Sequence, residues 1–228
     1  MNNTMIFGHR GYPARFPENS LEGFRYAIDN NIDGLEFDVH LTKDNVPVVI
    51  HDETVTRTTD GVGYIKDMDL SDVKKFKLRN GEKIPTLEEL LRIVEHKEIF
   101  LNLELKTNKI KYENIEWIVT KLIDQFHIIN PIIYSSFNLK SLKNLKLINK
   151  NAQCCYLTSR KISNPTQFMQ KHDLSALHLS YSDQTIMNNE RVWTVDSSFR
   201  MYNLLRKNVS GIITNNFTKA SRIRKLIS

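Results

Sequence analysis

Short apolar runs alternate with longer amphipathic stretches along almost the whole chain. A bounded apolar run of four to eight residues is typical of a buried strand, and apolar residues three and four positions apart are typical of a helix. The pattern predicts strands at residues 5–9, 34–39, 47–51, 99–105, 131–136, 153–157, 175–180, 191–195 and 210–214. It predicts helices at 20–30, 87–96, 113–127, 139–149, 165–172, 198–207 and 218–227, with a weaker one at 183–188. Thr86 and Glu89 have the spacing of a capping box at the start of the second helix.

The connection between the second and third predicted strands decides the fold class. About seven residues, around Thr42-Lys43-Asp44-Asn45, join them, whereas a parallel crossover needs about a dozen or more. We therefore expect an antiparallel hairpin here. Without that extra strand, eight βα units are left, which is the number in a TIM (β/α)8 barrel. A doubly wound sheet is the alternative, but no glycine-rich dinucleotide fingerprint follows the first strand, and the barrel is favoured.

The segment 52–84 interrupts the alternation of strands and helices. It is polar, contains Asp60-Gly61 and Asn80-Gly81 turns, and has one short helical signal from Leu70 to Phe76. Its apolar content is too low for a core of its own. We expect residues 1–228 to form a single barrel domain, with 52–84 as a small insertion at the barrel mouth after the strand that carries His51.

Polar side chains gather where the predicted strands end. Side chains alternate along a strand, so Glu36 and Asp38 share one face, and Glu104 and Lys106 share one face of a later strand. His9 ends the first strand and His51 ends the third. With the hairpin turn near residues 42–45, His51 is expected opposite Glu36. The carboxyl ends of barrel strands meet at one mouth, so these side chains are predicted to converge there.

This set of residue types indicates cleavage of a phosphate ester. Two imidazoles can exchange protons near pH 7, Arg10 can bind phosphate oxygens, and paired carboxylates can hold a hard cation. Taken singly, each residue has an ordinary explanation: a surface histidine, a solvated strand face, or a Glu104–Lys106 surface ion pair. Those explanations fail together, because every one of these residues falls at a strand end that a barrel brings to the same place.

Composition and charge add few constraints. The chain has 228 residues, 40% hydrophobic and 25% charged, as in an ordinary globular protein. Its net charge of +6 includes lysines at helical spacing from Lys140 to Lys150, which indicates a solvated helix face rather than a binding surface. The adjacent Cys154 and Cys155 suit buried, reduced thiols and a cytoplasmic protein. We expect no signal peptide, no stable membrane insertion and no nucleic-acid partner, and the oligomeric state stays open.

Ordered motifs over nearly the whole chain resemble the glycerophosphodiester phosphodiesterases. They begin with His9-Arg10-Gly11, Pro17-Glu18-Asn19-Ser20, Glu36-Phe37-Asp38-Val39, Thr42-Lys43-Asp44 and Val48-Val49-Ile50-His51-Asp52. They continue with Arg57-Thr58-Thr59-Asp60-Gly61, Ile84-Pro85-Thr86-Leu87-Glu88-Glu89, Glu104-Leu105-Lys106, Ser136-Phe137 and Val192-Trp193-Thr194-Val195. That family has a TIM barrel with a small insertion, in agreement with the strand count.

The resemblance implies a role for each matching residue. His9 and His51 are implied as the general acid and base, and Glu36, Asp38 and Glu104 as ligands of one divalent cation. Arg10 and Lys106 are implied to bind the phosphate and Trp193 to line the pocket. All-carboxylate ligands favour Mg²⁺ or Ca²⁺ over zinc. The implied reaction releases glycerol 3-phosphate and an alcohol from a small glycerophosphodiester, through attack of the glycerol 2-hydroxyl and hydrolysis of the cyclic intermediate.

Two positions depart from the family pattern. Asp196 stands where the family usually has asparagine, and Asn215 stands where it usually has aspartate. We expect this displaced acidic group to bear on metal affinity or substrate choice, while the enzyme stays active. The alternatives are a phospholipase C or lysophospholipase D type of barrel enzyme, and a module that only binds phosphate ligands. The intact set of two histidines and three carboxylates argues against the second.

Overall fold

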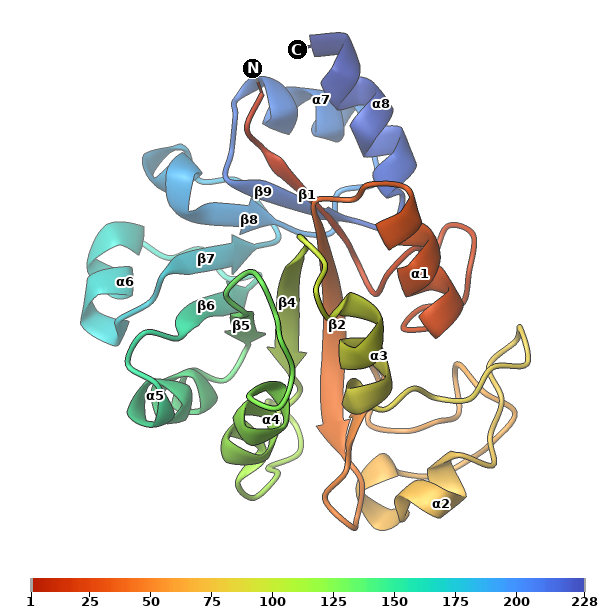
Figure 1. Ribbon diagram of the computed structural model, residues 1–228. Helices are drawn as coiled ribbons and strands as arrows, with labels where there is room; N and C mark the ends of the chain where they lie inside the picture. Colours follow the sequence, from red (N-terminus) through yellow and green to blue (C-terminus); the bar gives the residue numbers. More distant parts are fainter. Residues whose placement is uncertain (1, 228) are drawn as a thin grey trace.

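The chain folds as a closed barrel of eight parallel strands. The computed structural model describes residues 2–227, and strand pairing runs once around the ring in the order β1, β2, β4, β5, β6, β7, β8, β9 and back to β1 (Figure 1). The barrel strands are β1 (Met5–Gly8), β2 (Gly34–Leu41), β4 (Phe100–Leu105), β5 (Ile133–Ser136), β6 (Gln153–Thr158), β7 (Ala176–Leu179), β8 (Glu190–Val192) and β9 (Gly211–Thr214). The predicted TIM barrel is confirmed.

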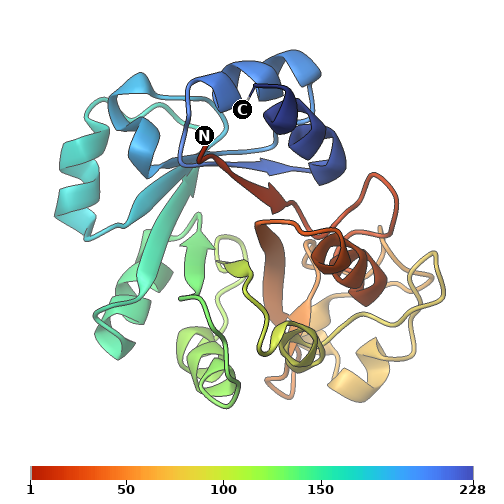
Figure 2. The same cartoon turned by 45° about the horizontal axis from the view of Figure 1, so that its top comes forward.

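Helices surround the ring of strands, as Figure 2 shows from a second direction. They are α1 (Leu21–Asp29), α3 (Leu87–Val94), α4 (Ile115–Ile123), α5 (Leu139–Ile148), α6 (Pro165–His172), α7 (Ser198–Arg206) and α8 (Phe217–Ile227), and the short 3-10 helix η2 (Gln184–Asn189) follows β7. The predicted capping box is present: the Thr86 side chain accepts from the Glu89 backbone, and the Glu89 side chain accepts from the Thr86 backbone. Within residues 2–227, none of these helices has the length and apolar character needed to cross a bilayer.

The alternation of side chains along the strands builds two separate apolar layers. Ile6, Leu35 and Ile212 belong to a large core that also contains Phe24 and Leu90 of the surrounding helices. Strand residues whose side chains point the other way form a second cluster that fills the barrel: Phe7, Ile133, Cys155, Ala176 and Ile213. The polar residues that form the site share the inward face with this second set.

Ring closure depends on the short pairing of β1 with β2. Phe7 lies opposite Gly34 in the register of these two strands. A Cβ added at Gly34 would come within 2.4 Å of the Phe7 ring. Gly34 is therefore the residue that lets Phe7 fill the barrel where the first and second strands meet.

The extra strand β3 (Pro47–Val49) pairs antiparallel with β2 and lies outside the ring, so the predicted hairpin is confirmed. One detail of the prediction is wrong. Val39 pairs with Val49 and His40 with Val48, so the continued register places His51 level with Phe37 rather than opposite Glu36. The turn holds one residue more than the sequence pattern indicated.

The segment after β3 packs beside the barrel, where Figure 1 shows it in orange and yellow next to β2. It contains the 3-10 helix η1 (Ile65–Asp67) and the one-turn helix α2 (Leu70–Val73). The expected lack of a core is wrong, because buried apolar side chains form a small cluster of their own: Val48, Ile50, Val55, Ile65, Val73, Leu78 and Ile84. Three of them lie at the ends of the segment: Val48 in β3, Ile50 directly after it, and Ile84 shortly before α3. The segment is therefore anchored at both ends.

Candidate active site

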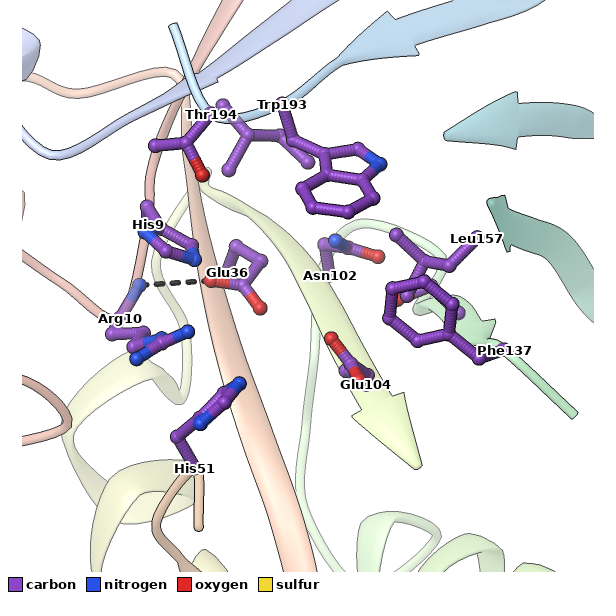
Figure 3. A pocket seen from close by; sticks show the side chains of 12 residues that line it. His9, Arg10, Glu36, His51, Asn102, Glu104, Phe137, Leu157, Trp193 and Thr194 are labelled. Carbon is purple, nitrogen blue, oxygen red and sulfur yellow. Dashed lines mark hydrogen bonds between the residues drawn. The ribbon is translucent and has the colours of Figure 1, made fainter. Parts of the chain in front are cut away.

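A pocket of about 100 Å³ opens among the carboxyl ends of the strands (Figure 3). Its walls come from seven of the eight barrel strands or the residues that directly follow them, and from His51 after β3. The lining residues are His9, Arg10, Glu36, His51, Asn102, Glu104, Ser135, Phe137, Leu157, Trp193, Thr194 and Ile213. Six of the eight residues predicted for the site line it, and the other two, Asp38 and Lys106, lie buried beside Glu104.

Three carboxylates form one buried cluster at the base of this pocket. One oxygen each from Glu36, Asp38 and Glu104 lies within 4.8 Å of the others, because β2 and β4 pair with Asp38 opposite Glu104. Burial and the neighbouring Asp38 raise the pKa of Glu36 well above its usual value. Burial raises the pKa of Glu104 to about 7, against the influence of Lys106. The positive charge of the neighbouring side chains is too small to offset the free-energy cost of ionising all three buried carboxylates.

The cluster fits a hard divalent cation. Among residues 2–227, the buried oxygens Asp38 Oδ1 and Asn102 Oδ1 accept no hydrogen bond, and buried oxygens normally find a partner. Asn102 lies opposite Glu36 in the strand register. Three carboxylates, with an amide oxygen beside them, are the donor set that Mg²⁺ and Ca²⁺ take in proteins. Asn102 was not singled out as a site residue from the sequence, although it shares the inward face with Glu104.

Two cations flank the carboxylates. Arg10 has a left-handed backbone, with φ of 52°, and its backbone N–H donates to Glu36 Oε2 at 2.8 Å (Figure 3). Lys106 Nζ lies 2.8 Å from Glu104 Oε1 and 3.5 Å from Asp38 Oδ1. Although burial acts in the opposite sense, Lys106 and Arg10 hold the pKa of Asp38 below its usual value. Asp38 is therefore the member of the cluster that stays ionised.

His9 contacts an amide rather than a carboxylate. Its Nδ1 lies 2.7 Å from Asn215 Oδ1, and the Asn215 backbone N–H and Nδ2 donate to Asp196 at 2.9 and 2.7 Å. Since Nδ2 donates to Asp196, the amide oxygen faces His9 and must accept from Nδ1–H. Burial, with Arg10 adding to it, lowers the pKa of His9 to about 4. His9 is thus neutral at pH 7, with the lone pair on Nε2.

The same contact explains the two departures from the family pattern. Asp196 and Asn215 are hydrogen-bonded to each other, so a carboxylate and an amide have exchanged places across one contact of 2.7 Å. The sequence showed both changes but gave no signal that they meet, or that His9 lies next to them, because 206 positions separate His9 from Asn215.

His51 lines the same space from below Glu36 in Figure 3, on the same side of the pocket as Arg10. Its Nδ1 lies 2.7 Å from Asp52 Oδ1, and its backbone carbonyl accepts from His40 Nε2 at 3.0 Å. Burial lowers the pKa of His51, while Asp38 acts the other way. The carboxylate partner of His51 opposes this effect of burial, whereas the partner of His9 is a neutral amide.

Aromatic side chains form the remaining wall. Phe137 and Trp193 meet edge to face at 5.6 Å, and Trp193 Nε1 donates to the His178 carbonyl at 2.9 Å. Figure 3 shows both rings on the side of the pocket away from Arg10. The pocket thus has a charged half and an apolar half.

Comparisons with known proteins agree on one family. The profile of the "Glycerophosphoryl diester phosphodiesterase family" matches residues 9–219. A glycerophosphodiester phosphodiesterase from Caldanaerobacter subterraneus subsp. tengcongensis is 33% identical, over 93% of this chain and 94% of the relative. One from Bacillus altitudinis is 32% identical, over 97% and 98%.

Solved structures show the same fold. A putative glycerophosphoryl diester phosphodiesterase from Agrobacterium tumefaciens superimposes with a TM-score of 0.90 at 24% identity, covering 98% of both chains. A phosphodiesterase from Oleispira antarctica, in complex with the product sn-glycerol-3-phosphate, has a TM-score of 0.87 at 25% identity, covering 97% of this chain and 96% of its own. The profile match and the similarity of the relatives show that this chain belongs to the glycerophosphoryl diester phosphodiesterase family.

Proposed function

We propose that this protein hydrolyses glycerophosphodiesters to glycerol 3-phosphate and an alcohol, using one divalent cation and the histidine pair His9 and His51. One observation carries the proposal: a buried three-carboxylate cluster lies at a pocket that two histidines of different hydrogen-bonding environment also line. The names of the relatives and the product bound to the Oleispira antarctica enzyme support the choice of substrate.

Glu36, Asp38 and Glu104 are the proposed ligands of the cation, Mg²⁺ or Ca²⁺. When bound there, such a cation offsets phosphate charge and increases the acidity of a hydroxyl beside it. The raised pKa values of Glu36 and Glu104 fit this assignment, since positive charge in the cluster would offset both the burial and the carboxylate repulsion that raise them.

The unequal partners of the two histidines divide the acid and base roles. Neutral His9 has its Nε2 lone pair available, so it accepts the proton of the glycerol 2-hydroxyl as that oxygen attacks phosphorus. His51, whose protonated form Asp52 favours against the effect of burial, is the proposed donor of a proton to the leaving alcohol. In the second half of the reaction the roles reverse: His51 accepts a proton from the water that opens the cyclic phosphate, and His9 returns its proton to the 2-oxygen.

The other residues bind and orient. Arg10 lines the pocket and is the proposed direct partner of the phosphate oxygens. Lys106 adds positive charge from beneath, through Glu104 and Asp38. Trp193 and Phe137 form the apolar wall for the carbon skeleton of the substrate.

The proposal extends to the setting in which the enzyme works. Residues 1–228 are proposed to act as one barrel domain, with 52–84 as the insertion beside its mouth. Cys154 and Cys155 are free, buried thiols, which supports a reducing compartment such as the cytoplasm. The substrate partner is a small molecule.

Release of glycerol 3-phosphate from glycerophosphocholine, glycerophosphoethanolamine, glycerophosphoglycerol and glycerophosphoinositol tests the proposal. We expect turnover that EDTA abolishes and Mg²⁺ or Ca²⁺ restores. His9→Ala and His51→Ala should each reduce it by at least about 100-fold, whereas His172→Ala, at the end of α6, should not. A lysophospholipid in the same panel tests the lipid alternative. Folded wild-type protein without turnover on any substrate and metal would overturn the proposal.

A further inference from the structure

We propose that Arg57, a residue of the insertion, is a positioning residue that holds both His51 and Arg10 in their working orientations. This inference rests on the proposed function, because it concerns the same pocket. Arg57 lies outside that pocket, on a neighbouring side cavity that Pro13, Phe16 and Arg79 also line. It acts through two carboxylates, Asp52 and Glu18, and touches neither reacting atom nor phosphate.

One guanidinium binds both carboxylates through paired hydrogen bonds. Arg57 Nε donates to Asp52 Oδ2 at 2.6 Å, and Nη2 donates to Asp52 Oδ1 at 3.0 Å. On its other edge, Nη1 donates to Glu18 Oε2 at 2.8 Å and Nη2 to Glu18 Oε1 at 2.7 Å. The planar fork of arginine matches this arrangement, and a lysine ammonium does not.

Each of the two carboxylates also holds one side chain that lines the pocket. Asp52 Oδ1 lies 2.7 Å from His51 Nδ1, and Glu18 Oε1 accepts from Arg10 Nη1 at 2.9 Å. A continuous network therefore runs from His51 through Asp52, Arg57 and Glu18 to Arg10. It joins the loop after β1 to the residues after β3.

The charges in the network sustain it. Hydrogen bonding from Arg57 is the main cause that lowers the pKa of Asp52, with His51 adding to it. Although burial acts in the opposite sense, Arg57 and Arg10 lower the pKa of Glu18. Both carboxylates stay ionised, so both oxygens of each can accept the hydrogen bonds of the network. Without Arg57, Asp52 and Glu18 would each lose two hydrogen bonds and could rotate away.

The network is suited to orientation rather than to holding the fold. The Arg57 side chain is 48% exposed, and exposed ion pairs add little to the free energy of unfolding. The insertion has its own apolar cluster, which includes Val55 two positions away. Displacement of a catalytic group by about 1 Å can cost about 100-fold in rate. The loss of Arg57 should therefore lower the rate much more than the stability.

Steady-state kinetics of Arg57→Ala and Arg57→Lys test the inference. In both variants we expect kcat to fall about 10- to 100-fold, with a smaller rise in KM. Losses of this size are typical when a residue that orients a metal ligand is removed. Added guanidinium ion should restore part of the activity of Arg57→Ala and leave wild type unchanged. Arg92→Ala is the matched control, since it removes the guanidinium of a surface pair with Glu88 on α3. A kcat of Arg57→Ala within twofold of wild type would overturn the inference.

A double-mutant cycle separates orientation from a general effect on structure. If Arg57 acts through Asp52 and Glu18, Arg57→Ala should lower kcat by less than twofold in an Asp52→Asn, Glu18→Gln background. If Arg57→Ala lowers kcat in that background by the same factor as in the otherwise native chain, the inference is overturned. Unfolding temperatures within a few degrees of wild type, from thermal melts of the same samples, are also expected.

A spectroscopic readout keeps this inference distinct from the proposed function. The His51 Nδ1–H proton, held by Asp52, should give a downfield NMR signal that His51→Ala identifies and that Arg57→Ala broadens or removes. A signal unchanged in Arg57→Ala would refute the positioning role even in an active enzyme. Its loss in a protein without turnover would refute the proposed reaction and leave the positioning role standing.

Discussion

Exchange of the residues at 196 and 215 should move the acidic limit of the reaction. The double variant Asp196→Asn, Asn215→Asp keeps the shapes and the hydrogen bonds of the pair but brings the carboxylate next to His9. In the native chain the amide of Asn215 separates His9 from Asp196, through two contacts of 2.7 Å each. The neutral form of His9 is the base, so activity falls as the pH drops through the pKa of His9, which is about 4.

The size of the shift follows from the change in distance between charge and ring. The carboxylate moves from roughly 6.5 Å to roughly 4 Å from the imidazole, and at an effective dielectric constant of about 20 its attraction for an imidazolium rises from ~2.5 to ~4 kcal/mol. The gain of ~1.5 kcal/mol corresponds to a rise of about one unit in the pKa of His9. The acidic limb should therefore move from about pH 4 to about pH 5.

The assay is the pH dependence of kcat/KM, which reports the free enzyme, with the NMR titration of the His9 ring as a measure independent of turnover. Asn215→Asp alone is the control, because it places two carboxylates in contact and one of them should take up a proton. An acidic limb and an NMR titration of the double variant that coincide with those of wild type would refute the assignment of the His9 partner.

Two further predictions concern the metal and the stability. Mg²⁺ or Ca²⁺ should raise the unfolding temperature of the wild-type protein, because a ligand of the native state stabilises it. The unfolding temperature of Glu104→Gln should rise less. Equal rises in the two proteins would contradict the assignment of Glu104 as a ligand. Burial lowers the pKa of His40 to about 4, so between about pH 6.5 and 4 the unfolded chain binds a proton that the native state does not. Over that range the free energy of unfolding of wild type, relative to His40→Gln, should fall by on the order of 3 kcal/mol; denaturant unfolding at several pH values would measure it, and a constant difference would show that His40 is not buried in its neutral form.

The barrel was predictable because its signals are local. Each strand is a short apolar run, and the length of one connection identified β3 as a hairpin strand outside the ring. The residue opposite His51 was predicted one position away from where it lies, at Glu36 instead of Phe37. The sequence locates the turn around Asn45 but does not show how many residues it holds, and one residue changes every pairing that follows.

The core of the insertion was missed for a different reason. Five of the seven cluster residues lie within 52–84, but Val48 and Ile50 come from β3 and the residue after it. A count restricted to the segment leaves out the neighbours that complete its cluster. The charged half of the pocket followed from alternation along β2 and β4, whereas the partners of its histidines depend on contacts between distant parts of the chain.

The contact between His9 and Asn215 should make assembly of the site a late event of folding. The first 106 residues already contain both histidines, the three carboxylates and Arg10, and the β2–β3 hairpin can form from near neighbours alone. The pairing of β1 with β9 joins the two ends of the chain, and contacts of such long sequence separation form slowly. A nascent chain still without β9 has every group that performs the proposed chemistry, yet its base has no partner to fix its tautomer. The proposed activity would therefore report barrel closure, and incomplete chains would be inactive although they contain every catalytic side chain.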